Sequence, residues 1–95
     1  MNFDSIPEAF KTKLRVAIMA ALYSGPKDFN TLKQITSATD GNLSVQLSKL
    51  EELEYVTSTK TIVNKKSYTE YCATDVGRKN FYEYVEFLAW IVKEG

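Results

Sequence analysis

Apolar residues recur at steps of three and four positions over the first quarter of the chain. They are Phe10, Leu14, Ala17, Ile18, Ala21 and Leu22. This spacing lines one face of an α-helix. Ser5 can cap such a helix and Pro7 suits its first turn, so we expect a helix over about residues 6–23. The stretch SGPK at residues 24–27 should end it, because proline cannot continue a helix and glycine accepts a left-handed cap.

Two shorter helical segments follow, separated by a brief polar break. The first, over about residues 30–37, should turn Leu32 and Ile35 inward. The second should begin at Asp40 or just after it, and it carries four leucines at helical spacing: Leu43, Leu47, Leu50 and Leu53. Two short helices joined by a turn of about three or four residues form a helix-turn-helix.

The pattern then changes to an alternation with period two. The stretches YVTSTKTIV (55–63) and SYTEYCAT (67–74) are rich in β-branched and aromatic residues, which favour strands. The turn between them contains Asn64, Lys65 and Lys66. We therefore expect a β-hairpin with a basic tip over about residues 55–73. Within it, Cys72 is expected to be a small buried side chain and not a reactive thiol.

A last helix is predicted over about residues 75–93, with Thr74 as its N-cap. Its apolar residues wrap much of the circumference, and a helix of this kind needs more than one partner surface. In so small a domain, the second surface is most easily another copy of the protein. The residues expected at this dimer interface are Phe81, Tyr84, Val85, Phe87, Leu88, Trp90 and Ile91.

The length of 95 residues allows one domain over residues 1–95, and a hydrophobic content of 44% is sufficient for a core. The element order predicts a mainly α fold with a small β-hairpin, in the α+β class. It consists of three N-terminal helices, a two-stranded wing and a long C-terminal helix.

The composition argues against an enzyme. The chain has no histidine and a single cysteine, so it lacks the commonest general base and any Cys-His nucleophile. No metal-binding spacing and no Gly-rich phosphate loop is present, so we expect neither a metal nor a cofactor. The N-terminus lacks the pattern of a signal peptide and no segment is long enough to span a bilayer, so a cytoplasmic protein without membrane contact is expected.

Two stretches carry a resemblance to a known family. FNTLKQITSATDGNLSVQLSKLEELEYV (29–56) resembles the helix-turn-helix region of MarR-like and ArsR-like winged-helix transcriptional regulators, in particular a short single-domain subgroup with a T-D-G-N-L-S recognition helix. YTEYCATDVGRKNFYEYVEFL (68–88) looks like the subgroup's second wing strand, T-x-x-G-R turn and C-terminal helix. The resemblance covers about residues 14–88 and implies a winged helix-turn-helix fold, but no particular operator or effector.

Two positions depart from the subgroup. Gln46 stands where the subgroup often has histidine, and it keeps the ability to form hydrogen bonds. Glu54 stands where the subgroup has a glycine, which costs roughly 1 kcal/mol if the position is left-handed. The departures affect the expected base preference more than the expected fold.

The third helix of this fold lies in the major groove of DNA, so the resemblance implies DNA contacts on its outward side. The candidates are Thr39, Asn42, Ser44, Val45, Gln46, Ser48 and Lys49. Asparagine and glutamine can pair bidentately with adenine, and Val45 can touch a thymine methyl. For any single polar residue, an ordinary solvated position is the alternative interpretation.

The zero net charge argues against DNA binding, but the charges are unevenly distributed. Residues 56–80 carry Lys60, Lys65, Lys66, Arg78 and Lys79 against Glu70 and Asp75, whereas the end of the chain is acidic. The wing residues Asn64, Lys65 and Lys66 are therefore expected to contact phosphates. Lys33 is a further phosphate candidate, and Arg78 should contact either a phosphate or a carboxylate of its own domain.

These observations favour a sequence-specific transcriptional regulator that binds double-stranded DNA as a homodimer. The alternative is a winged-helix protein-interaction module whose aromatic last helix docks a partner and whose third helix contacts no DNA. The neutral net charge and the acidic cluster at Glu51, Glu52 and Glu54 support that alternative.

Overall fold

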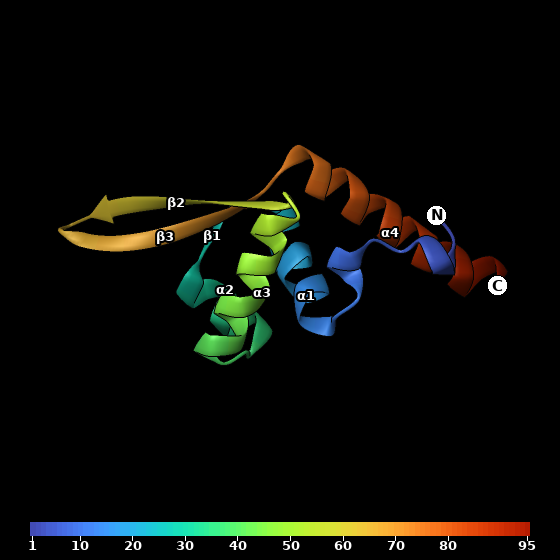
Figure 1. Cartoon of the computed structure of the whole chain (residues 1–95), viewed down its shortest axis with the longest axis horizontal. Coiled ribbons are helices and arrows are strands. Elements are labelled where there is room, and N and C mark those ends of the chain that lie inside the picture. The colour runs from blue at the N-terminus through green and yellow to red at the C-terminus, as the bar shows by residue number, and fades with distance from the viewer.

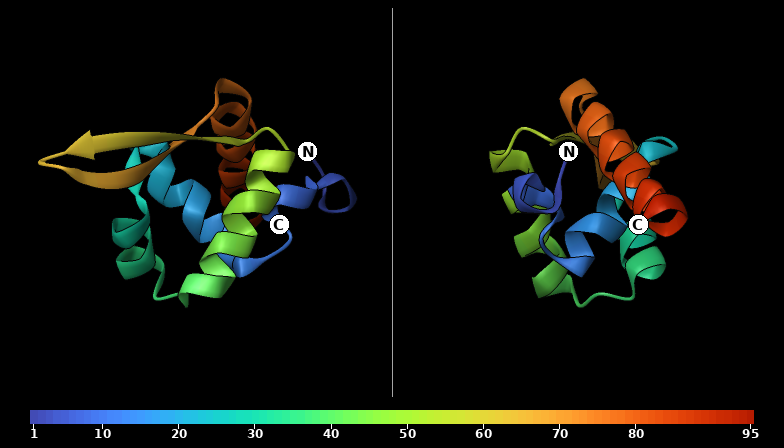
Figure 2. Two further views of the ribbon diagram at one scale, coloured as in Figure 1. Left: turned by 60° about the vertical axis from the view of Figure 1, so that its left-hand side comes forward. Right: turned by 90° about the vertical axis from the view of Figure 1, so that its right-hand side faces the viewer.

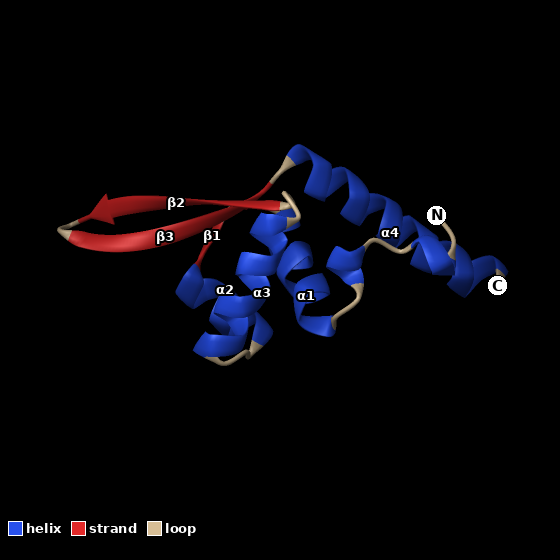
Figure 3. Cartoon of the chain, viewed as in Figure 1, coloured by secondary structure: helices blue, strands red, loops and turns tan.

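Four α-helices and three β-strands follow two short 3-10 turns in the computed structural model, which describes residues 1–95. In chain order the elements are η1 (Phe3–Ser5), η2 (Glu8–Phe10), α1 (Lys13–Tyr23), β1 (Lys27–Asp28), α2 (Phe29–Thr36), α3 (Asp40–Glu52), β2 (Val56–Val63), β3 (Lys66–Ala73) and α4 (Asp75–Glu94). The molecule measures 52 × 25 × 22 Å, and the β2–β3 hairpin and α4 extend in opposite directions from the helical body (Figure 1). Helices predominate, as predicted (Figure 3).

The core lies where α1 packs against α2, α3 and α4. Its fully buried side chains are Ile18, Met19, Leu22, Leu32, Leu43, Leu47 and Leu50. Figure 2 shows α1 between α3 and α4. The leucine spacing therefore correctly identified the inner face of α3, and α3 begins at Asp40 as predicted.

The first helix is shorter than predicted, because the chain leaves helical geometry at Thr12. Thr12 has φ −126° and ψ 145°, and its side chain accepts a hydrogen bond from the Arg15 amide, so Thr12 is the N-cap of α1. The residues before it form η1 and η2. Ser5 does not cap a helix; it closes a reciprocal capping box with Asn2. The prediction of a continuous helix from residue 6 was therefore wrong.

The helix-turn-helix consists of α2 and α3. Ser37 ends α2 in the left-handed conformation with φ 58°, and Thr39 caps α3 by accepting a hydrogen bond from the Asn42 amide. Leu32 is fully buried as predicted, whereas Ile35 is 52% exposed and the prediction that it points inward was wrong. Leu32 is the one fully buried residue of α2, so the contact face of this short helix is narrower than its apolar pattern indicated.

The sheet has three antiparallel strands in the order β1-β3-β2, whereas two were predicted. β1 pairs Lys27 with Tyr71 and Asp28 with Glu70. A strand of two residues is too short to show an alternating pattern, which explains why it was not predicted. Cys72 is exposed, contrary to prediction, because alternate residues of a strand point to opposite faces and its neighbour Ala73 takes the buried side.

The T-x-x-G-R turn joins the start of α4 to the end of α3. The Thr74 hydroxyl donates to the Glu54 carbonyl at 2.8 Å and accepts from the Gly77 amide at 3.0 Å. Gly77 lies against the Tyr55 carbonyl, so that a Cβ at this position would come within 2.5 Å of the carbonyl oxygen. Glu54 has φ 64°, which confirms the left-handed conformation considered for this departure from the subgroup.

The first half of α4 packs on the domain and the second half extends beyond it (Figure 1). Phe81 is buried beside Phe10, with ring centroids 5.7 Å apart, and Tyr84 stacks on Phe10 at 4.9 Å. These aromatic contacts attach η2 to α4. No helix in the chain has both the length and the apolar character that crossing a membrane requires.

Candidate nucleic-acid interface

The outward side of α3 presents a row of polar residues from its first turns. Of the predicted contact residues, Thr39, Asn42, Ser44, Val45 and Ser48 are exposed, and Gln46 and Lys49 are half-buried. The leucines of α3 occupy the opposite side and are buried. The structure thus places all seven predicted residues of this helix on surfaces that a ligand can reach.

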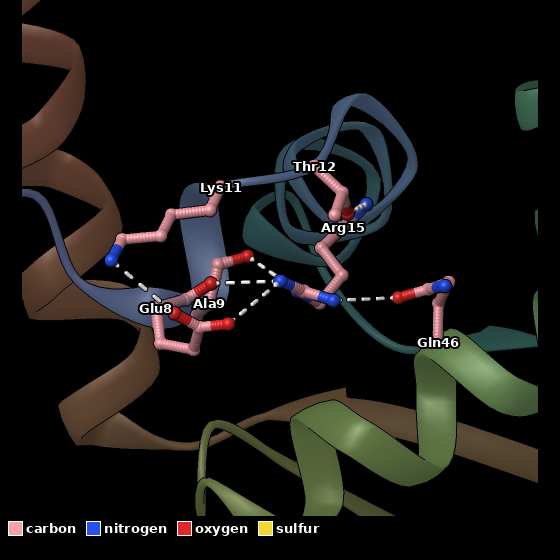
Figure 4. Close-up of polar contacts among 6 residues, drawn as sticks. All are labelled: Glu8, Ala9, Lys11, Thr12, Arg15 and Gln46. Atoms are coloured by element: carbon pink, nitrogen blue, oxygen red, sulfur yellow. Dashed lines mark hydrogen bonds and ion pairs between the residues drawn. The ribbon is translucent and has the colours of Figure 1, made fainter.

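Gln46 is hydrogen-bonded to Arg15 of α1, a residue that was not predicted from the sequence to belong to the site (Figure 4). The Arg15 Nη1 donates to Gln46 Oε1 at 2.8 Å. Gln46 Nε2 in turn donates to Asn42 Oδ1 at 3.4 Å, one helical turn earlier in α3. The position of Arg15 in α1, three residues before the buried Ile18, was a sequence signal that it belongs to the inner face of this helix.

Arg15 is only 6% exposed, and each of its three guanidinium nitrogens donates a hydrogen bond within the domain. Its Nε donates to the Ala9 carbonyl at 3.0 Å and its Nη2 donates to the Glu8 carbonyl at 2.9 Å. The Glu8 carboxylate lies 3.6 Å away and provides a countercharge. A buried cation is tolerated in a fold when it is paired and hydrogen-bonded in this way.

Lys33 of α2 pairs with Asp40 in the first turn of α3 at 2.7 Å. Both side chains are well exposed, so the pair contributes little to stability. The pair places a carboxylate beside the free amides at the start of α3, where the helix dipole favours negative charge. Lys33, a candidate for phosphate contact, is therefore partly neutralised in the free protein.

The wing carries cations without internal partners. Asn64 and Lys65 form the hairpin turn with φ 51° and 65°, and Lys66 begins β3 opposite Val63. Lys60, Lys65 and Lys66 are exposed, and the ion pairs of the molecule involve Lys11, Arg15 and Lys33 but none of these wing lysines. The basic tip predicted for the hairpin is therefore present and free.

A groove of about 310 Å³ lies between the start of α2 and strand β3. It is lined by Asp28, Phe29, Asn30, Ser44, Ser67, Tyr68, Thr69 and Tyr71. Ser44 is the residue of α3 that reaches it, so this side of the helix faces the wing. Glu51 and Glu52 lie at the C-terminal end of α3. Burial and the nearby Glu51 raise the pKa of Tyr71.

Arg78 pairs with no carboxylate of its own domain, and its alternative partner, a DNA phosphate, stays a prediction. Its guanidinium donates to the Tyr23 carbonyl and lies over the Tyr23 ring, 4.4 Å from the centroid. Arg78 thus satisfies a carbonyl at the end of α1, where a cation also suits the helix dipole. Its role in this structure is to hold α4 on α1.

The predicted dimer residues divide into a buried and an exposed group. Phe81 is 7% exposed and belongs to the core of its own chain, which removes it from the surface available to a second copy. Tyr84 and Phe87 are half-buried. Val85, Leu88, Trp90 and Ile91 are between 39% and 57% exposed. An apolar surface therefore remains uncovered along the outer half of α4.

Comparison with known proteins gives the family. Residues 14–92 match the model of a winged helix DNA-binding domain. Protein MJ0432 of Methanocaldococcus jannaschii is 38% identical over 77 residues, which cover 80% of this chain and 84% of that protein, and its function is uncharacterised.

Two solved structures share the fold. A transcriptional regulator homologue from Pyrococcus horikoshii superposes with a TM-score of 0.76 at 23% identity, covering 90% of both chains. A protein of Enterococcus faecalis described as a MarR-family transcriptional regulator has a TM-score of 0.77 at 20% identity, covering 84% of this chain and 73% of that one. With the family match over residues 14–92, these findings show that the chain belongs to the winged helix DNA-binding domain family.

Proposed function

We propose that the chain is a sequence-specific transcriptional regulator that binds double-stranded DNA as a homodimer. The observation that carries the proposal is the polar side of α3, exposed next to a wing whose lysines have no internal partners. Membership of a family of DNA-binding domains gives this surface its most direct interpretation.

The proposed binding mode puts α3 in the major groove and the wing on the phosphate backbone. The first turn of α3 offers a phosphate the amides of Asp40 and Gly41, because the Asn42 and Leu43 amides are bonded to Thr39. Gly41 has no neighbour within 4 Å of a Cβ position, so a DNA backbone can approach there. Lys65 and Lys66 lie at the hairpin tip, away from α3, so they would contact phosphates beyond those that α3 reaches and would enlarge the DNA interface.

The proposed dimer forms through α4. Its outer half exposes Val85, Leu88, Trp90 and Ile91, an apolar surface that a second copy would cover. Two α3 helices would then enter successive major grooves, about 34 Å apart. The matching operator is a two-fold symmetric site with half-sites about one helical turn apart.

Selection of bound duplexes from a random pool tests this function directly. The wild-type chain should enrich a symmetric motif, and Gln46→Ala should change which bases are enriched at one position of each half-site. A pool that remains random after repeated selection, with the protein folded, would contradict sequence-specific binding.

The exposed apolar surface of α4 also favours a second candidate, a protein-interaction module without DNA binding. The same selection separates the two functions. A module of this kind would enrich no sequence and would have no affinity for DNA even at low salt, while retaining binding to its protein partner through α4.

A further inference from the structure

The orientation of the Gln46 amide is determined by a contact from inside the domain (Figure 4). A guanidinium can only donate hydrogen bonds, so the atom facing Arg15 Nη1 at 2.8 Å must be the carbonyl oxygen of Gln46 and not its nitrogen. A bond from a charged donor is also stronger than one between neutral groups. The amide of Gln46 is thus fixed with its oxygen inward and its nitrogen toward Asn42.

Arg15 is itself held firmly enough to act as an anchor. It is 6% exposed, and two of its nitrogens are bound to main-chain carbonyls of Ala9 and Glu8, which cannot rotate away. Gln46 is its one partner on α3. Releasing Gln46 would leave a nitrogen of a buried cation without its acceptor, so the pair should persist when DNA binds.

This orientation decides what Gln46 can offer a base. Bidentate recognition of adenine needs the amide oxygen to accept from N6 while the amide nitrogen donates to N7. With the oxygen turned toward Arg15 and one N–H bonded to Asn42, the second N–H of Gln46 is the group that remains for a base edge. Acceptors in the major groove that suit such a donor are O6 and N7 of guanine and O4 of thymine.

We propose that Arg15 is a positioning residue that fixes Gln46 as a hydrogen-bond donor, so that Gln46 selects guanine or thymine and rejects bidentate pairing with adenine. This inference rests on the proposed function, because it assigns base preference within the same α3 surface. Arg15 touches no DNA in this arrangement and acts only through the amide of Gln46.

The hydrogen-bond order from Arg15 through Gln46 to Asn42 supports the same polarity. The Oδ1 of Asn42 accepts from Gln46 at 3.4 Å, and Asn42 is exposed, which leaves its amide nitrogen as a further donor. Two neighbouring positions on one side of α3 therefore present donors. An acceptor-rich base edge, such as that of guanine, is complementary to this pair.

The test is selection from a random duplex pool with the full chain and four variants: Gln46→Ala, Gln46→Glu, Arg15→Met and the Arg15→Met/Gln46→Ala double variant. Gln46→Ala identifies the base position that Gln46 controls. There the wild type should favour guanine or thymine over adenine by at least about fivefold, since a good pair discriminates by about 1–3 kcal/mol. Arg15→Met should lose this preference and gain adenine at that position alone. In the Gln46→Ala background, Arg15→Met should change no base preference.

Gln46→Glu keeps a partner for Arg15 and so preserves the fold if Arg15→Met does not. Its carboxylate offers acceptors only, so guanine and thymine should be lost at the controlled position and cytosine gained. Thermal unfolding of each variant separates this effect from a structural one, because reduced stability alone lowers affinity for every sequence without changing the preferred base.

Several results would overturn the inference. They are adenine preferred by the wild type at the Gln46 position, an unchanged preference in Gln46→Glu, or a motif that does not respond to Gln46→Ala. In each of these the proposed DNA-binding function still holds, because a motif is enriched. Absence of any enriched motif would instead overturn the proposed function together with this inference.

Discussion

Gly77 lies in the first turn of α4, where its Cα packs closely against the main chain of Tyr55, which follows α3. A Cβ there would lie 2.5 Å from the Tyr55 carbonyl oxygen and 3.1 Å from the Met19 Cε. The carbonyl belongs to the main chain, which cannot move aside without disturbing the bond from the Thr74 amide to the same oxygen. The glycine of the T-x-x-G-R turn is therefore needed for close approach and not for an unusual φ.

Gly77→Ala should lower the free energy of unfolding by about 1–3 kcal/mol, the usual cost of overpacking. The sign is informative, because alanine in place of glycine inside an unobstructed helix raises stability by roughly 1 kcal/mol. Gly41→Ala in α3 is the matched control, since nothing lies within 4 Å of its Cβ position, and it should be neutral or stabilising. Urea unfolding of both variants measures the difference, and equal stabilities would show that the contact at Tyr55 is not restrictive.

Glu54 shows how a residue can depart from a pattern without changing the fold. Its φ of 64° is the conformation that glycine adopts most easily, and glutamate accepts it at a cost of roughly 1 kcal/mol. Its carbonyl still accepts from the Thr74 hydroxyl. The residue identity thus affects stability at this junction, while the geometry of the junction is kept.

At the scale of elements, the start of α2 depends on a single side chain. Asp28 accepts a hydrogen bond from the Thr31 amide at 2.8 Å, which makes it the N-cap. Hydrogen bonds from the main chain and side chain of Thr31 lower the pKa of Asp28 below its ordinary value of 3.8. Because the folded pKa is lowered, the stabilisation is present above the ordinary value and is lost as the pH falls through the folded pKa.

Asp28→Ala should therefore lower the free energy of unfolding by about 1 kcal/mol at pH 7. Asp28→Asn is the matched control, because asparagine caps a helix about as well without a titratable group. The difference in free energy of unfolding between wild type and Asp28→Ala should shrink below about pH 4. The corresponding difference between Asp28→Asn and Asp28→Ala should stay constant with pH, because asparagine does not titrate. Thermal unfolding measured between pH 3 and 7 checks this, and a loss that is constant across the range would contradict the role of the carboxylate.

Elements with a periodic pattern were predictable and irregular ones were not. The leucines of α3 and the alternation of the hairpin each extend over several residues, so both elements were found from sequence. The break at Thr12 depends on one residue adopting an extended conformation, and β1 depends on pairing with β3 more than forty positions away. Neither leaves a periodic signal, since tertiary contacts decide both.

The candidate site was predictable in the same uneven way. The exposed side of α3 follows from the position of its leucines, and the basic wing follows from its lysines and turn residues. The link between Arg15 and Gln46 joins residues 31 positions apart, so no local pattern could reveal it. Arg15 could at most have been recognised as a charge on the inner face of α1.

At the scale of the whole molecule, the two surfaces of the proposed function lie at opposite ends. The hairpin with its free lysines extends from one end of the helical body and the exposed apolar half of α4 from the other (Figure 1). Charge follows the same division, because residues 56–80 are basic and Glu83, Glu86 and Glu94 follow in α4. In the proposed function, this separation would leave one end for a second copy and the other for phosphates.

Val85→Lys should prevent the proposed dimer, because it puts a charge into the apolar surface of α4. Val76→Lys is the matched control, since Val76 is also an exposed valine of α4 but lies outside the predicted interface. Light scattering should give about twice the 10.8 kDa chain mass for the wild type and Val76→Lys, and the single mass for Val85→Lys. A wild type of 10.8 kDa at high micromolar concentration would contradict the dimer.

The most direct measurement is the salt dependence of DNA affinity for the wild type and for Lys65→Ala/Lys66→Ala. Each phosphate contact adds about 0.9 to the slope of log K against log salt, so the double variant should lose affinity for all sequences and about two units of slope. Lys11→Ala/Lys93→Ala removes the same charge outside the proposed interface and should keep the slope. The wild type should bind duplex DNA with a steep salt dependence that requires the wing lysines. A wild type with no affinity for DNA at low salt, or one whose slope is unchanged without Lys65 and Lys66, would contradict DNA binding through α3 and the wing.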